Sequence, residues 1–185
     1  PATPIMARLL QQGGAGTSLH QAVLLRAPSG LREEHLVGAL QSVLDHHDAL
    51  RLRLAGSAAQ AGLEVAPRGS VSARAVLQRL DVSGLSEAAL RACIREHATA
   101  AARRLAPASG VMLQAVWLSG GAQELLLVSI HHLAIDAVSW RILLPDLAAA
   151  WSSIAGGETP QLAGGGTSLR AWSLRLADYA QTPAA

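Results

Sequence analysis

Residues 125–144 read LLLVSIHHLAIDAVSWRILL, and this stretch decides how the rest of the chain is interpreted. The apolar run from Leu125 to Ile130 follows a turn signal at residues 119–121 and is rich in aliphatic side chains. This pattern predicts a strand that is covered on both faces. Because the run stops at His131 and His132, we expect two histidines at the end of a central strand.

The two histidines and the aspartate that follows them could form a catalytic site. Neighbouring residues on a strand point to opposite faces, so we expect one histidine to face a cleft and the other to pack. Asp136 comes four residues after His132, near the start of the next predicted helix, where a carboxylate suits the helix dipole and can fix the turn. On these residues alone, a catalytic site and a structural histidine pair capped by Asp136 are equally good interpretations.

Length and composition indicate one globular unit. The chain has 185 residues, of which 50% are hydrophobic, enough to bury one substantial core. No apolar run reaches the roughly 20 residues needed to cross a bilayer, so we expect no membrane span. The opening residues 1–4 do not resemble a signal peptide, and a cytoplasmic protein is the default expectation.

Cysteine and charge content exclude further classes of function. The single Cys93 excludes an internal disulfide framework and a zinc-thiolate site. All 15 basic residues are scattered arginines, and the net charge is only +2, so no nucleic-acid-binding face is expected. With no Phe and one Tyr, the chain also lacks the aromatic platforms that single-stranded nucleic acid needs.

Predicted strands and helices alternate along the chain. Helices are predicted after Thr3, across residues 31–47, from Ser86 to Arg104, after Asp136 and after a cap at Thr167 or Ser168. Strands are predicted across residues 19–26, 50–54, 76–82, 111–118 and 123–130. Pro145 is expected to kink or restart the fourth helix, because proline removes a backbone donor. The alternation indicates a mixed α/β lobe built from two layers.

A second histidine pair stands at the end of the predicted helix 31–47. Residues 46–51 read HHDALR, and Arg51 alone would be interpreted as a solvated arginine on an edge strand. A metal site made by His46, His47, His131 and Asp136 is an alternative. Adjacent histidines diverge, however, and no third ligand lies at helical spacing, so we expect no metal.

The pattern His-His-x-x-x-Asp-x-x-Ser-Trp at residues 131–140 resembles the active-site motif of the condensation and epimerization domains of nonribosomal peptide synthetases. Its extended form, HHLAIDAVSWRILLPDL, looks most like the epimerization branch. By that resemblance His132 is the catalytic base. The supporting residues are His131, Asp136, Ser139 and Trp140. The residue after the aspartate is usually glycine in the family, whereas this chain has Ala137.

Two other segments share the resemblance. HHDALR resembles the family's second motif, whose arginine pairs with the active-site aspartate, which assigns Arg51 to Asp136. Arginine suits that role because it stays charged and binds a carboxylate through two parallel donors. His20-Gln21 stands where family members usually carry an aromatic residue and a polar amide.

The resemblance spans nearly the whole chain and implies a fold. That fold is an α/β (α+β) two-layer sandwich of the chloramphenicol-acetyltransferase-like type, forming the N-terminal half of a V-shaped two-lobe domain. We expect residues 1–153 to form the lobe with the catalytic motif, residues 154–167 a Gly-rich linker, and residues 168–185 a helix leading to a C-terminal lobe that this chain lacks. The isolated chain is therefore expected to be inactive.

The resemblance also implies a reaction. An epimerization domain converts L- to D-aminoacyl or peptidyl residues, held as a thioester on the 4'-phosphopantetheine of a peptidyl carrier protein, in the biosynthesis of secondary metabolites such as antibiotics. No cofactor would be bound directly, and other synthetase modules would be partners. The alternatives are a condensation domain that forms amide bonds with the same histidine, and a non-catalytic lobe that docks a carrier protein. Ala137 is the feature that favours a non-catalytic lobe.

Overall fold

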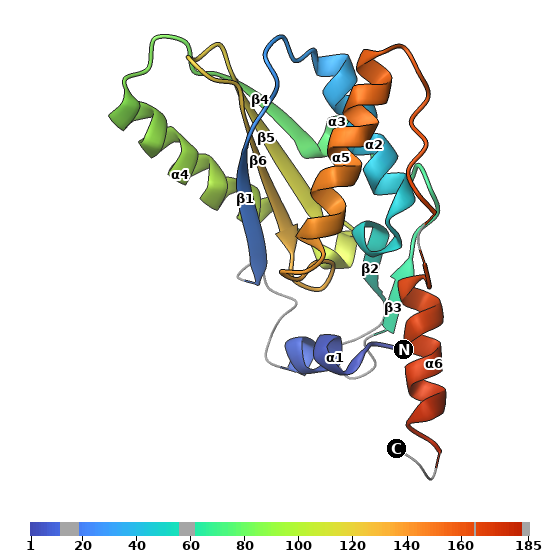
Figure 1. Cartoon of the computed structure of the whole chain (residues 1–185). Helices are drawn as coiled ribbons and strands as arrows, with labels where there is room; N and C mark the ends of the chain where they lie inside the picture. Colours follow the sequence, from blue (N-terminus) through green and yellow to red (C-terminus); the bar gives the residue numbers. More distant parts are fainter. Residues whose placement is uncertain (12–18, 56–61, 165, 183–185) are drawn as a thin grey trace.

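The computed structural model describes residues 1–11, 19–55, 62–164 and 166–182. It centres on a four-stranded mixed sheet (Figure 1). The strands, in spatial order, are β1 (His20–Arg26), β6 (Leu125–His131), β5 (Leu113–Ser119) and β4 (Leu77–Asp81). β6 pairs antiparallel with both neighbours, and β4 runs parallel to β5. The strands predicted across residues 111–118 and 123–130 are therefore present as the antiparallel pair β5 and β6, and β6 is an inner strand, as expected for an apolar run of this length.

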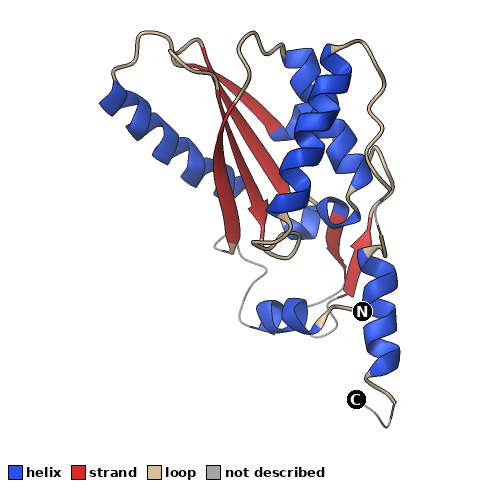
Figure 2. Cartoon of the chain, in the orientation of Figure 1, coloured by secondary structure: helices blue, strands red, loops and turns tan. Residues whose placement is uncertain are grey.

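Helices cover both faces of this sheet (Figure 2). Helices α2 (Glu33–His46) and α5 (Trp140–Ala155) pack together on one face, and α4 (Glu87–Arg104) packs on the other. Side chains alternate along β6, so Leu126, Val128 and Ile130 belong to the core beneath α2 and α5, whereas Leu127 belongs to the core beneath α4. The predicted mixed α/β class is confirmed, and α4 adds a helical layer to the two that were expected.

A smaller unit lies below the sheet in Figure 1. It contains α1 (Pro4–Gln11), the hairpin of β2 (Leu52–Ala55) and β3 (Gly62–Val65), and α6 (Leu169–Tyr179). Its apolar cluster includes Met6, Leu52, Met112 and Leu133, so the segment after the histidine pair is anchored in this cluster. The short α3 (Ala73–Val76) leads directly into β4.

Two local predictions need correction. The alternating residues 50–54 were expected to form a strand throughout, but Asp48–Arg51 form a 3₁₀ turn and β2 begins only at Leu52. The restart expected at Pro145 is wrong, because helix α5 continues through the proline, and the alternative of a kink stays a prediction. A proline inside a helix removes one backbone hydrogen bond, and the burial of Leu143 and Ala150 on either side holds the helix together across that gap.

Other boundaries follow the predicted caps. Ser86 Oγ accepts a hydrogen bond from Ala89 N at the start of α4, and Ser168 Oγ accepts one from Ala171 N at the start of α6. Each cap satisfies a backbone donor that has no partner within its helix. Of the helices in the described residues, none is both long enough and apolar enough to traverse a bilayer.

Candidate functional site

The end of β6 separates the two histidines of residues 131 and 132. His131 is 0% exposed, its backbone N–H donates to Met112 O, and its Nδ1 accepts from Leu133 N at 3.2 Å. His132 is half-buried, and its backbone N–H donates to Leu19 O at 2.9 Å. One histidine thus packs in the core and the other is half-buried just beyond the end of β6, as strand alternation predicts.

The ring of His132 is fixed by the loop that follows it. Its Nδ1 lies 2.7 Å from Ile135 O, and a carbonyl oxygen can only accept, so Nδ1 carries a proton. In the neutral imidazole the lone pair is then on Nε2. The side chain of Ile135 is buried in the main core, which holds this carbonyl in place. The loop therefore presents a histidine whose Nε2 can act as a base.

A chain of polar contacts reaches Nε2 from the neighbouring strand and helix. Gln21 of β1 places its side-chain nitrogen 3.4 Å from His132 Nε2. Trp140, the first residue of α5, donates its indole N–H to Gln21 Oε1 at 2.8 Å. Sequence reasoning noted Gln21 only as a family position and missed this contact. A signal was present in β1, where the apolar Val23 and Leu25 occupy the face on which polar Gln21 also lies.

Asp136 and Ser139 form a cap at the turn before α5. Asp136 Oδ1 accepts from Ser139 N at 2.7 Å and from Ser139 Oγ at 2.6 Å. These hydrogen bonds favour the carboxylate and lower the pKa of Asp136 below its ordinary value. The aspartate is exposed, so its role in this structure is to fix the turn that carries Trp140.

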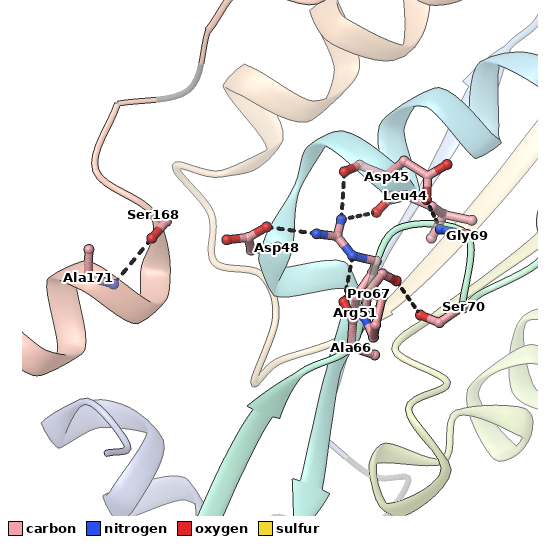
Figure 3. A network of polar contacts seen from close by, with 10 residues as sticks. All are labelled: Leu44, Asp45, Asp48, Arg51, Ala66, Pro67, Gly69, Ser70, Ser168 and Ala171. Atoms are coloured by element: carbon pink, nitrogen blue, oxygen red, sulfur yellow. Dashed lines mark hydrogen bonds and ion pairs between the residues drawn. The ribbon is translucent and has the colours of Figure 1, made fainter.

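The predicted ion pair between Arg51 and Asp136 is absent from the structure, and both residues are described. Arg51 is 3% exposed, and its guanidinium donates to Leu44 O at 2.6 Å and Asp45 O at 2.7 Å (Figure 3). Its carboxylate partner is Asp48, at 2.8 Å. The terminal carbonyl groups of a helix lack partners and carry partial negative charge, so they attract a cation placed just beyond the helix end. That cation is Arg51.

The HHDALR segment also ties α2 to α5. His47 Nε2 lies 2.9 Å from Asp146 Oδ2 of α5. Burial lowers the pKa of His47, and His46 adds to this effect, while Asp146 opposes it. Ligand atoms of His46, His47 and Asp146 lie within 4.8 Å of one another, so the structure replaces the alternative metal set considered from the sequence with a different one. The contact between His47 and Asp146 joins α2 to α5, and we interpret it as a structural link between the two helices.

Comparison with known proteins decides the family. The profile of the condensation domain family matches residues 6–184. This chain belongs to the condensation domain family. A linear gramicidin synthase protein of Brevibacillus parabrevis is 36% identical over 165 residues, which cover 88% of this chain and 3% of that protein. Chondramide synthase of Chondromyces crocatus is 33% identical over 164 residues, which cover 88% of this chain and 4% of that protein.

Solved structures show the fold of this condensation-family chain. The epimerization domain from the third module of tyrocidine synthetase B matches with a TM-score of 0.86 and 24% identity, covering 98% of this chain and 41% of that one. The starter condensation domain of rhizomide synthetase matches with a TM-score of 0.80 and 16% identity, covering 98% of this chain and 45% of that one. The chloramphenicol-acetyltransferase-like fold is thereby confirmed. The chain spans less than half the length of either structure.

The family position usually held by glycine tolerates alanine in this loop. Among the described residues, positive φ angles occur only at glycines, so Ala137 has an ordinary backbone conformation. Its side chain is exposed. The backbone of Ala137 therefore does not need the conformational freedom of glycine.

Proposed function

We propose that this chain is the N-terminal lobe of an epimerization domain of a nonribosomal peptide synthetase. In this proposal residues 1–153 form the lobe and residues 154–167 the linker, although α5 itself extends to Ala155, and residues 168–185 contain the helix α6 (Leu169–Tyr179) that leads to a C-terminal lobe. The substrate is an aminoacyl or peptidyl thioester on the 4'-phosphopantetheine of a peptidyl carrier protein. The family membership and the resemblance of residues 131–147 to the epimerization motif support this assignment.

The single observation that carries the proposal is the orientation of His132. Epimerization requires a base that removes the proton from the α-carbon beside the thioester carbonyl, and a general base must present a lone pair within hydrogen-bond reach of that proton. The contact of Nδ1 with Ile135 O leaves this lone pair on Nε2, just beyond the end of β6. His131 is buried and serves the fold, so His132 is the base of the proposed reaction.

Structure adds roles for the residues that distinguish the epimerization motif. Ser139 completes the cap with Asp136, and Trp140 holds the amide that faces His132. Both residues therefore act on the geometry around the proposed base. The Val-Ser-Trp segment that resembles the epimerization branch thus contributes residues that position the surroundings of His132, and for this reason we favour epimerization.

Condensation is the second candidate, because the condensation domain family to which the chain belongs is consistent with either reaction. In that reaction His132 would assist amide formation between two carrier-bound groups. The two reactions differ at one bond, because epimerization breaks the α-carbon–hydrogen bond and condensation leaves it intact.

The test uses the complete two-lobe domain with its loaded carrier protein in heavy water. Without an acceptor amine, we expect deuterium to enter the α-position and the two stereoisomers to mix. His132→Ala should reduce this exchange by about 10²- to 10⁴-fold, the usual contribution of a general base. His131→Ala is the matched control, and its effect should appear mainly as a lower Tm. Amide product without α-exchange would establish condensation instead, and carrier binding with neither activity would leave a docking lobe.

A further inference from the structure

We propose that Gln21 is a catalytic residue that donates a hydrogen bond to the thioester carbonyl oxygen of the substrate as negative charge develops there. The assignment deepens the proposed function and depends on it. It comes from the directions of the polar contacts around the side chain of Gln21, which lies on β1 beside the proposed base.

The orientation of the Gln21 amide follows from its neighbours. An indole nitrogen can only donate, so the atom that receives the Trp140 N–H at 2.8 Å is the amide oxygen. The amide nitrogen must then face His132 Nε2, at 3.4 Å. Because Nδ1 of the same ring holds its proton against Ile135 O, the Gln21 N–H points at a lone pair.

The length of this last contact indicates that it can be exchanged for a contact to substrate. Normal N–H···acceptor bonds span about 2.7–3.2 Å between heavy atoms. The 3.4 Å separation is longer, whereas the Trp140–Gln21 bond is of ordinary length. The amide is therefore held firmly at its oxygen and weakly at its nitrogen. A donor fixed in this way costs little reorganisation when charge appears nearby.

The chemistry of a thioester needs a donor at this position. His132 Nε2 removes the α-proton, and the electron pair of the C–H bond moves to form an enolate whose charge is on the former carbonyl oxygen. Gln21 N–H donates to that oxygen. A general acid supplied by the other lobe of the complete domain then returns a proton to the other face of the α-carbon, and the enolate reverts to the thioester. Since the α-carbon and carbonyl carbon are bonded neighbours, base and donor must lie side by side, as these two nitrogens do.

Trp140 is a positioning residue in this arrangement. It reaches no substrate atom in the proposed step and acts by fixing which end of the amide faces His132. Its contact crosses from α5 to β1, so the turn capped by Asp136 also sets the position of the amide. This gives the tryptophan of the motif a function distinct from packing.

The experiment measures α-deuterium exchange by the complete domain with its loaded carrier protein. Gln21→Glu keeps the size of the side chain but replaces the donor with an anion, and we expect kcat to fall by about 10²- to 10³-fold, as for loss of one oxyanion donor, with little change in KM. Trp140→Phe keeps a ring but removes the N–H, and kcat should fall by about 2- to 10-fold. His20→Gln, on the opposite face of β1, is the control and should exchange like the parent domain.

Folding is checked separately by Tm, and Gln21→Met gives a neutral variant without donors, which should show the same loss of kcat as Gln21→Glu. If His132→Ala abolishes exchange while both Gln21 variants retain it, the role of Gln21 is overturned and the proposed function stands. If the parent domain forms amide and does not exchange, the same variants are measured for amide formation, where a donor to the thioester oxygen is equally needed. Loss there would uphold the role of Gln21, and full activity there would overturn it. Absence of both reactions overturns the two proposals together.

Discussion

The chain contains two histidine pairs with a nearby aspartate, and they end in opposite arrangements. His46 and His47 close a helix, and His131 and His132 close a strand. At the helix end the two imidazole rings stay together, with centroids 4.8 Å apart, and His47 binds Asp146. At the strand end the pleat sends His131 into the core and leaves His132 half-buried, with Nδ1 bound to Ile135 O and its lone pair on Nε2.

The contrast shows that the backbone, rather than the dipeptide, decides whether a histidine is available for chemistry. The helix-end pair lies beside Arg51 and Asp146 and joins α2 to α5. The strand-end pair is divided between the core and the site. The substitutions below test two points. The first is whether the region around His46 and His47 stabilises the fold, and the second is whether the region around His131 and His132 is energetically independent of it.

The largest effect on stability is expected at Arg51, which anchors the region of the first pair. Arg51→Ala should lower the free energy of unfolding by about 3–5 kcal/mol, because it leaves carbonyl groups at the end of α2 and the Asp48 carboxylate without their cation. Urea unfolding monitored by circular dichroism measures the change. Arg53→Ala is the matched control, since Arg53 pairs with Glu64 on the surface, and it should cost about 1 kcal/mol or less. Equal costs would contradict the buried role of Arg51.

A smaller effect is expected at His47. His47→Ala should cost about 1–3 kcal/mol, because the half-buried Asp146 loses its partner, whereas His46→Ala should cost about 0.5 kcal/mol. Both values come from urea unfolding near pH 7.5. A larger loss of unfolding free energy for His46→Ala than for His47→Ala would show that His46, rather than His47, makes the stabilising contact between α2 and α5.

The pH dependence of stability provides a second measurement on His47. Its pKa is lowered in the folded protein, so within the interval between the folded and unfolded pKa values the unfolded chain binds more protons. Stability should therefore fall as the pH drops below about 6.5, the unfolded value. His47→Ala should reduce this fall relative to the parent chain. An unchanged pH profile in the variant would show that His47 is not responsible.

The smallest effect is expected for the coupling between the two regions. Asp136→Ala should cost about 0.5–2 kcal/mol through loss of the cap on Ser139. Arg51 and Asp136 share no hydrogen-bond partner. The loss of unfolding free energy in the double variant should therefore equal the sum of the losses in the two single variants within about 0.5 kcal/mol. A coupling energy well above that value in unfolding experiments would instead support the ion pair between Arg51 and Asp136 that the family's second motif implies.

Much of the fold was predictable because it depends on local rules. The 3.6-residue period of α2, the serine caps of α4 and α6, and the apolar run of β6 each specify their element without knowledge of distant contacts. The divergence of His131 and His132 likewise follows from strand geometry alone. Asp136 was expected to fix its turn, and its bonds to Ser139 confirm this.

Only the tertiary structure decided which residues meet across the chain. Gln21 and Trp140 are 119 positions apart and come together because β1 pairs with β6 while α5 packs over the same face of the sheet. Arg51 joined the end of α2 rather than Asp136, because carbonyl groups a few residues away bind a buried guanidinium without the cost of bringing in a distant carboxylate. Sequence periodicity fixes the face on which a side chain lies, but the atom that it contacts depends on how separate elements pack, and that information is not local.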